Sequence, residues 1–214
     1  MSRTADAPGI DELRSAWSTR RSFNATLCGG RAVMEGLADG TPVTPGALAT
    51  ATGLALDVVA ESIRLASATG VETDDGAIVG AALTLRPTPH QFRVRGHDLY
   101  TWCGFDALFV PIVLGELAEV VSACPATGAE IRLTVGPDGT VSKRSPDAVV
   151  VGIVGREVLS CCSTTGPGSD VCSQMPFFAS HDAAERWLGV HPGVAIVDLD
   201  TARPIAAAFA ATFP

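Results

Sequence analysis

The sequence contains few charged residues and no long apolar segment. Only 18% of its 214 residues are Asp, Glu, Lys or Arg. The longest apolar runs, such as ALFVPIVLG, are too short to span a bilayer. Because 47% of the residues are hydrophobic and the mean hydropathy is +0.30, the chain has enough apolar side chains to fold around a core. We therefore expect a globular protein that is not embedded in a membrane.

Positive charge is scarce as well. The 15 basic and 23 acidic residues give a net charge of -8, which disfavours nonspecific binding to nucleic acid or to an anionic membrane. The first 17 residues contain no apolar segment typical of a secretory signal, so we expect a cytoplasmic protein. In that compartment cysteines are usually thiols rather than disulfides. The six cysteines are Cys28, Cys103, Cys124, Cys161, Cys162 and Cys172.

Common cofactor motifs are missing from the sequence. It has no GxGxxG in a strand-to-helix context, no phosphate-binding P-loop and no paired CxxC of a zinc site. The four histidines, His90, His97, His181 and His191, form no evident ligand cluster, and we expect them to be surface or supporting residues. We therefore expect no required cofactor.

The N-terminal part has the pattern of a helical module. Apolar spacing predicts two helices within residues 10–38, a short helix between residue 41 and a turn at Gly53, and a helix over residues 57–68. An Asp-Asp-Gly turn then predicts a β-hairpin, which completes the outline of a winged helix-turn-helix. The expected inward face of the last helix comprises Val58, Val59, Ser62, Ile63, Leu65 and Ala66.

This module lacks the charge of a DNA-binding domain. Residues 41–85 contain one basic residue, Arg64, and five acidic ones. Phosphate neutralisation by Lys and Arg supplies most of the nonspecific affinity for DNA. A structural or lid-like role is therefore the better interpretation, and we expect no nucleic-acid partner.

The remainder of the chain predicts mixed helices and strands. HQFRVR is expected to be a strand, and Asp98 to cap a helix that runs through Cys103 until Pro111 stops or kinks it. Two strands around a Pro-Ala-Thr-Gly turn follow, then a strand at DAVVVGIV, a helix, a strand and a last helix with Pro204 in its first turn. The expected fold is α+β, with a winged-helix-like module over residues 1–84 packed on a catalytic domain over residues 85–214.

Cys103 and Asp106 stand three positions apart in the segment LYTWCGFDALFVP. Residues i and i+3 share a helix face, so Asp106 can receive the thiol proton, and helix polarity should modestly favour the thiolate. Burial beside Trp102, Phe105 and Phe109 would raise the pKa of Asp106, so that it can also act as an acid. The alternative from these residues alone is an inert core thiol and a solvated carboxylate.

Three separated segments resemble one known family. LYTWCGFDALFVP, VVSACPATGAEIRLTV, and VCSQMPFFAS with GVAIVDL are similar, in this order, to segments of the organomercurial (alkylmercury) lyases. The resemblance implies that Cys103, Asp106 and a second cysteine before Phe177-Phe178, here Cys172, are catalytic. It also implies a structural role for Cys124.

The chain departs from the family pattern beside the second cysteine. Some family members have an adjacent Cys pair followed by histidines, whereas this chain has Ser173, Gln174, Met175 and Pro176 after Cys172. An adjacent pair occurs instead at Cys161-Cys162, and an alternative alignment would make one of these the second catalytic thiol. The register set by Phe177-Phe178 favours Cys172.

The implied activity is protonolysis of a carbon–mercury bond. Mercury is a soft ion and thiolates are its best protein ligands. Cys103 would bind R-Hg⁺ after losing its proton to Asp106, Cys172 would add as a second thiolate, and Asp106 would protonate the leaving carbon. Hg(II) would remain as product on Cys103 and Cys172 near Asp106, and small thiols or a mercuric reductase would accept it. The alternatives are a soft-metal carrier or sensor without turnover, and a silent relative that binds another ligand.

Overall fold

The computed structural model describes residues 30–67, 70–154, 171–189, 191 and 193–213. Three helices come first: α3 (Arg31–Ala38), α4 (Pro45–Thr52) and α5 (Leu56–Ser67). Thr44 caps α4 by accepting a hydrogen bond from the Ala47 amide, and Gly53 ends it with a left-handed φ of 72°. The short helix, the Gly53 turn and the following helix are thus confirmed, whereas the first helix expected before residue 30 lies outside the described residues.

The inward face of α5 is narrower than expected. Val59, Ile63 and Ala66 are buried, but Val58 and Leu65 are exposed and Ser62 is only half-buried. The three buried positions have the spacing of a single helical stripe. The prediction was wrong for Val58 and Leu65 because hydrophobic character alone does not show where a neighbouring element stops covering a helix.

A hairpin follows the helices, and its turn is the predicted one. Strand β1 (Glu72–Asp74) pairs antiparallel with β2 (Ala77–Ala81). Asp75 and Gly76 both have positive φ, 46° and 78°, as a type I′ turn requires. Strand β2 then pairs with β3 (Leu83–Thr84), so the hairpin is continuous with the main sheet. The winged-helix interpretation and the division after residue 84 stay predictions.

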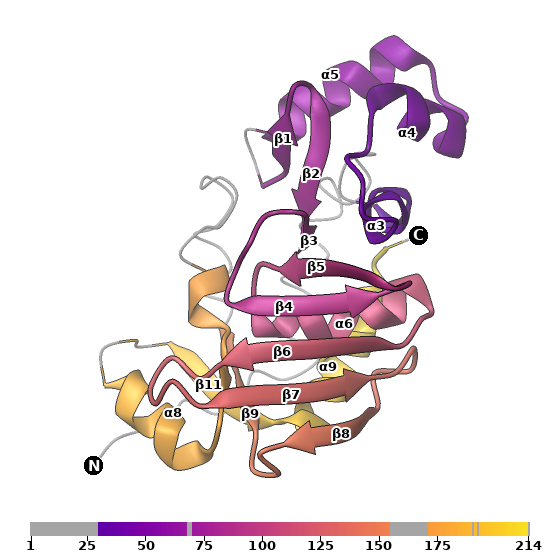
Figure 1. The fold of residues 1–214 in the computed structure, drawn as a ribbon. Coiled ribbons are helices and arrows are strands. Elements are labelled where there is room, and N and C mark those ends of the chain that lie inside the picture. Colours follow the sequence, from indigo (N-terminus) through magenta and orange to yellow (C-terminus); the bar gives the residue numbers. More distant parts are fainter. Residues whose placement is uncertain (1–29, 68–69, 155–170, 190, 192, 214) are drawn as a thin grey trace.

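The main sheet has eight strands in the order β1-β2-β3-β5-β4-β6-β7-β8, and its neighbours pair antiparallel (Figure 1). The predicted strand at HQFRVR and the two strands around the Pro-Ala-Thr-Gly turn are confirmed. The other strands of this sheet are β4 (His90–Val94), β5 (His97–Thr101), β6 (Ala118–Ala123), β7 (Glu130–Val135) and β8 (Val141–Ser145).

A second, three-stranded sheet has the order β10-β9-β11 and includes the predicted strands at DAVVVGIV and GVAIVDL. Its strands are β9 (Val150–Val154), β10 (Phe177–Phe178) and β11 (Val194–Asp198). Two helices belong to this part, α8 (His181–Leu188) and α9 (Leu199–Ala210). Both helices were expected, although Pro204 lies in the second turn of α9 rather than in its first.

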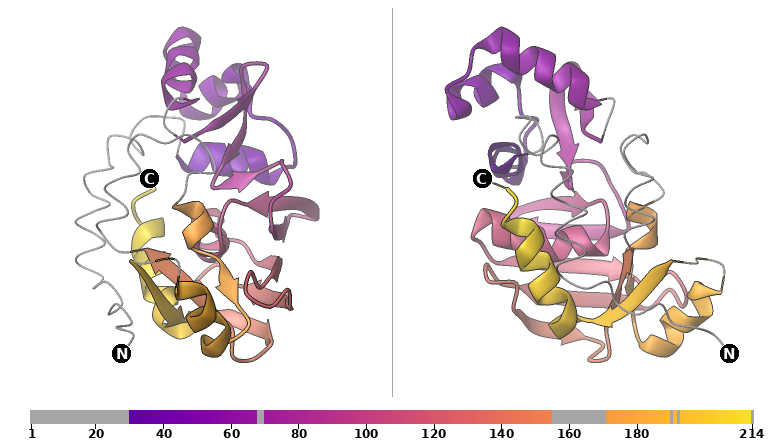
Figure 2. Two further views of the ribbon diagram at one scale, coloured as in Figure 1. Left: turned by 90° about the vertical axis from the view of Figure 1, so that its left-hand side faces the viewer. Right: turned by 180° about the vertical axis from the view of Figure 1, so that it is seen from behind.

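Helix α6 (Gly104–Leu114) lies behind the main sheet and packs on α9 (Figures 1 and 2). Ten of its eleven residues are buried. Phe109 contacts Phe209 edge to face at a centroid distance of 4.7 Å and stacks on Phe213 at 5.6 Å. A helix that is apolar all round is expected between two layers, and here it joins the two sheets into one core.

The start of α6 differs from the prediction. Asp98 lies in β5 and caps no helix, whereas Cys103 itself is the N-cap and Pro111 lies inside the helix without ending it. Strand β5 was missed because its residues, HDLYT, follow a turn at Gly96 and have few apolar side chains. Cys103 therefore precedes the first turn of the helix instead of standing in the second.

Polar contacts connect the N-terminal helices to the rest of the molecule. Arg95 donates to Asp39 Oδ1 at 2.8 Å and pairs with Glu116 at 2.7 Å, and Arg31 Nε donates to the Val113 carbonyl at 2.9 Å.

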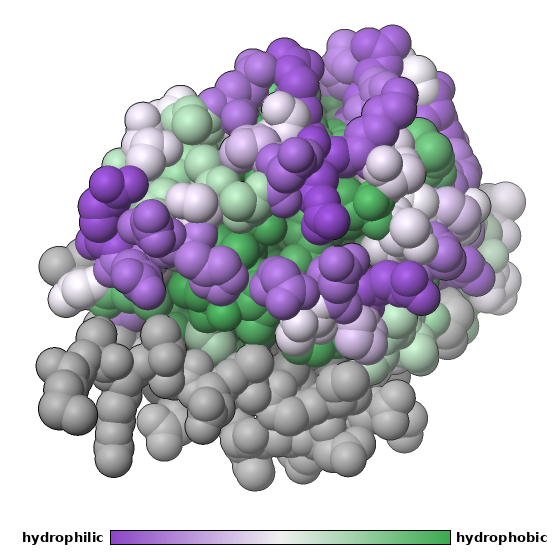
Figure 3. Space-filling model, turned by 90° about the horizontal axis from the view of Figure 1, so that it is seen from below, coloured by the Kyte–Doolittle hydropathy of each residue, from purple (hydrophilic) through white to green (hydrophobic). Residues whose placement is uncertain are grey.

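Seen from below, apolar residues gather in the middle of the face and polar residues border them (Figure 3). Among the described helices none is both long and apolar enough to cross a membrane alone; α4 and α5 reach that length only together, with a bend of 116°.

Candidate active site

Cys103 lies two residues after the end of β5 and is the N-cap of α6. Its backbone is extended, with φ -147° and ψ 171°, and its Sγ accepts a hydrogen bond from the Asp106 amide at 3.3 Å. Ser, Thr, Asp and Asn are the usual N-caps, and a thiol is a much weaker acceptor. Capping alone therefore does not explain a cysteine at this position.

Asp106 is the third residue of α6 and is buried, with 8% of its surface exposed. Its Oδ2 has no hydrogen-bond partner among the described residues. Burial raises the pKa of Asp106 to about 7, although its hydrogen bonds with Cys103 act in the opposite direction. The predicted rise is confirmed, and the alternative of a solvated carboxylate was wrong. Buried side-chain oxygens without a partner are rare, and catalytic groups are among the exceptions.

Cys172 comes from a distant part of the chain. It begins the short 3-10 helix η2 (Cys172–Gln174), which is separated from β10 by two residues, and its side chain is half-buried. The Gly104 amide donates to the Met175 carbonyl at 2.8 Å, and the Gly152 amide donates to the Pro176 carbonyl at 3.0 Å. These two hydrogen bonds hold the segment after Cys172 against the first residue of α6 and against β9.

Gly104 makes this close approach possible. A Cβ at position 104 would lie 2.9 Å from the Met175 carbonyl oxygen and 3.1 Å from the Phe177 amide nitrogen. Both neighbours are backbone atoms, so a larger residue would move the segment that follows the second cysteine. The Trp-Cys-Gly-Phe-Asp order thus places the smallest residue where two chain segments meet.

The fold brings the three predicted site residues together. One ligand atom each from Cys103, Asp106 and Cys172 lies within 4.8 Å of the others. Burial raises the pKa of the Cys103 thiol well above its ordinary value, and the Cys172 side chain and the Asp106 charge raise it further. The Asp106 amide at the start of α6 favours the thiolate, as expected, but desolvation at a fully buried position is the larger effect. Two sulfurs and one carboxyl can bind a single soft ion.

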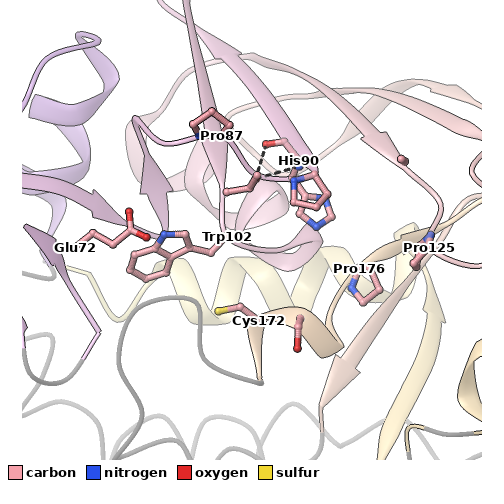
Figure 4. A pocket seen from close by; sticks show the side chains of 11 residues that line it. Glu72, Pro87, His90, Trp102, Pro125, Cys172 and Pro176 are labelled. Carbon is pink, nitrogen blue, oxygen red and sulfur yellow. Dashed lines mark hydrogen bonds between the residues drawn. The ribbon is translucent and has the colours of Figure 1, made fainter.

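A cavity of about 370 Å³ opens beside Cys172 (Figure 4). Four prolines and Trp102 supply rigid walls, and Cys172 is the site cysteine that lines it. Cys172 is therefore the site sulfur that a small molecule in this cavity would meet. Its lining residues are Glu72, Pro87, Thr88, Pro89, His90, Trp102, Ala123, Pro125, Cys172, Ser173 and Pro176.

His90 is a site neighbour that sequence reasoning did not single out. It is buried, its Nδ1 lies 2.8 Å from Ser122 Oγ, and its ring meets Phe177 edge to face. Burial lowers the pKa of His90 to about 4, so the ring is neutral at physiological pH. The supporting role expected for it is consistent with this packing. No pattern in the sequence relates His90 to residues 172–177, because the contact depends on the fold.

The structure describes three of the six cysteines. Cys103, Cys124 and Cys172 are free thiols, whereas Cys28 and the pair Cys161-Cys162 lie outside the described residues. Cys124 is buried directly after β6, in the turn rather than in the strand. Burial raises its pKa, but hydrogen bonds from Thr127 and nearby backbone groups lower it by more.

Paired thiols beside a buried carboxyl, with a helix N-terminus between two sheets, define a class of protein suited to soft-metal chemistry. The family model described as MerB: Alkylmercury lyase matches residues 83–211. Curated alkylmercury lyases are also similar: that of Streptomyces lividans is 43% identical over 163 residues, 76% of this chain and 72% of its own. That of Pseudomonas putida is 37% identical over 203 residues, 94% and 91% of the two chains.

A solved structure shares the fold. The mercury-bound form of MerB2 superposes with a TM-score of 0.79, covering 94% of this chain and 98% of the other, at 24% sequence identity. The similarity in sequence extends through the site segments and both sheets. The chain belongs to the alkylmercury lyase family.

Proposed function

We propose that the protein cleaves the carbon–mercury bond of organomercurials by protonolysis and releases R–H and Hg(II). Membership in the alkylmercury lyase family supports this activity. The observation that carries the mechanism is the Asp106 carboxyl, buried with a free oxygen and with a pKa of about 7, within 4.8 Å of two cysteine sulfurs. A carboxyl with such a pKa can both accept and donate a proton near neutral pH.

Mercury is the substrate atom in this reaction, and the two sulfurs are its ligands. Thiolates match a soft ion better than any other side chain. A second thiolate adds electron density to mercury and weakens its bond to carbon. We propose Cys103 and Cys172 as these ligands, with Asp106 close enough to contact the Hg(II) product.

The burial of the two thiols favours an order of attachment opposite to the one expected from the sequence, in which Cys103 bound first. Cys172 lines the cavity, whereas Cys103 is fully buried. Cys172 therefore exchanges first: R–Hg–SR′ and the Cys172 thiol give R–Hg–S–Cys172, and the thiol proton leaves with R′SH. The Cys103 thiol then transfers its proton to the Asp106 carboxylate, and the new Cys103 thiolate binds mercury.

Proton transfer to carbon completes the reaction. Protonated Asp106 donates to the carbon as the carbon–mercury bond breaks, which yields R–H, Hg(II) on two thiolates and the carboxylate again. One proton from Cys103 is thus used, and mercury stays divalent. The cycle requires no cofactor in this scheme, and small thiols or a mercuric reductase would accept the Hg(II) product.

Hydrocarbon release tests the proposal. The protein is incubated with phenylmercury and excess thiol, and benzene is measured in the headspace. Turnover is expected for the unaltered chain and for Cys124→Ala, but not for Cys103→Ala or Cys172→Ala. Adduct without benzene from the unaltered chain would instead support the alternative of a mercury-binding protein or sensor. Near-normal turnover of Cys172→Ala would move the second thiol to Cys161 or Cys162.

The Asp106→Asn variant separates the two roles of the carboxyl. If Asp106 only helps to ionise Cys103, turnover should recover progressively as the pH rises, at a higher pH than the value of about 8.5 at which a free thiol ionises, because burial raises the pKa of Cys103. If it also protonates carbon, asparagine has no proton to donate and hydrocarbon release stays low at every pH. We expect the second result, together with an R–Hg adduct that mass spectrometry detects. Recovery in alkaline buffer would contradict the proton-donor role.

A further inference from the structure

Glu72 gives the cavity beside Cys172 its charge. Among the described lining residues it is the only Asp, Glu, Lys or Arg, and the one histidine, His90, is neutral because burial lowers its pKa to about 4. Glu72 comes from β1, the first strand of the hairpin that follows the N-terminal helices. A residue far from Cys103 in the sequence thus borders the cavity that Cys172 lines.

The Glu72 side chain is held in place from two sides. Its Oε2 accepts a hydrogen bond from Thr84 Oγ1 at 2.8 Å, and Thr84 is fully buried. The same oxygen lies over Gly80, which faces Glu72 across the hairpin, and a Cβ at Gly80 would collide with it. The carboxylate therefore has a fixed position rather than the freedom of a surface side chain.

Figure 4 shows the Glu72 carboxylate beside the indole of Trp102, with the Cys172 sulfur facing the same space. The indole Nε1 of Trp102 is buried and has no hydrogen-bond partner among the described residues. No described cation lines the cavity to offset the carboxylate. A second negative charge that entered this space would thus meet Glu72 without compensation.

Given the proposed function, we infer that Glu72 is a specificity-determining residue that selects organomercurials with an uncharged organic group and disfavours those with an anionic one. The cavity has room for such a group: about 370 Å³ exceeds the roughly 150 Å³ that holds a benzene molecule in a protein interior. Prolines and Trp102 form apolar walls, so alkyl and aryl groups fit their chemistry.

The expected discrimination follows from charge repulsion in a partly enclosed site. Like charges several ångströms apart, at the effective dielectric constant of a protein surface, disfavour binding by roughly tenfold or more. Salt weakens such an effect where solvent reaches the charges. The discrimination should therefore be large in dilute buffer and smaller at high ionic strength.

Two probes of equal shape isolate the charge: para-carboxyphenylmercury and para-carbamoylphenylmercury. The measured quantity is the rate of thiol loss on mixing, with mass spectrometry of the adduct, so that it does not depend on turnover. The unaltered chain should react about tenfold more slowly with the carboxylate probe than with the amide. Glu72→Gln, which keeps an acceptor for Thr84, should bring the two rates within about threefold of each other.

Glu119→Gln is the matched control, because it removes the same charge from an exposed position on β6. In Glu119→Gln the ratio of the rate with the carboxylate probe to the rate with the amide probe should equal the ratio for the unaltered chain. Equal rates for both probes with the unaltered chain, or equal ratios in Glu72→Gln and Glu119→Gln, would overturn the inference. Charge-dependent capture without release of hydrocarbon would leave Glu72 as the selecting residue and refute the lyase reaction instead.

Discussion

Replacing Asp106 with asparagine should change how the stability of the protein depends on pH. The Asp106 carboxyl is buried, and its pKa is raised from 3.8 to about 7, chiefly by burial. In the unfolded chain the carboxyl ionises near pH 4. Between about pH 4 and pH 7 the native state therefore binds more protons than the unfolded state, and the stability of the native state falls as the pH rises.

The size of the change in stability follows from how far burial raises the pKa of Asp106. A rise of about three pKa units corresponds to roughly 4 kcal/mol, which is absent below pH 4 and fully present as destabilisation above pH 7. The asparagine side chain of the variant would stay neutral throughout, although its amide hydrogens would lack partners at a cost of about 1–3 kcal/mol at every pH. The difference in unfolding free energy, Asp106→Asn minus unaltered chain, should therefore increase by about 4 kcal/mol from pH 4 to pH 8.

Urea denaturation of the mercury-free, reduced protein at several pH values measures this difference, because effects common to both proteins cancel. Asp198→Asn is the control with the opposite sign. Asp198 caps α9, and its hydrogen bond from the Thr201 amide lowers its pKa, so its stabilisation is lost as the pH falls. A pH-independent difference for Asp106→Asn would show that the carboxyl is not desolvated, and the proposed acid–base role would lose its physical basis.

Two further substitutions test packing around the site. Cys124→Ala should lower the free energy of unfolding by about 1–2 kcal/mol, measured by urea denaturation, while turnover stays within about twofold, since Cys124 is buried outside the thiol pair. Turnover lost without a loss of stability would contradict the structural role. Gly104→Ala should cost about 1–3 kcal/mol and slow hydrocarbon release, because its Cβ would press on the Met175 carbonyl. Gly46→Ala in α4, which meets no atom within 4 Å, should be neutral or stabilising, and equal effects of the two would refute the argument.

Local sequence patterns predicted most of the helices and strands, and they predicted that two of the site residues lie close together. Cys103 and Asp106 could be joined from their spacing alone, and their contact through the Asp106 amide is local. The burial of Asp106 was also predictable, because Phe105 and Phe109 flank it in an apolar segment. Turn residues predicted the β1–β2 hairpin and the turn between β6 and β7 in the same way.

Features that depend on long-range packing were harder to predict from the sequence. The start of α6 was misplaced because a short strand with few apolar side chains, here β5, resembles a loop before a helix. The net rise of the Cys103 pKa was missed because helix polarity is visible in a sequence, whereas complete burial is not. Cys172 was assigned to the site by family resemblance, since no local rule joins residues so far apart in the chain. Glu72 gave no signal at all, because its position in the cavity depends on the hairpin meeting Trp102.

The separation of the two site cysteines along the chain has a thermodynamic consequence. A mercury ion held by both sulfurs would act as a cross-link that closes a loop of about 70 residues, and chain-entropy arguments assign such a closure about 4 kcal/mol. The loaded protein would then resist unfolding more than the empty one, in proportion to how firmly both sulfurs hold the ion. The temperature of unfolding would then measure how much of the protein holds mercury. A thiol that removes the mercury would lower the free energy of unfolding in the same step.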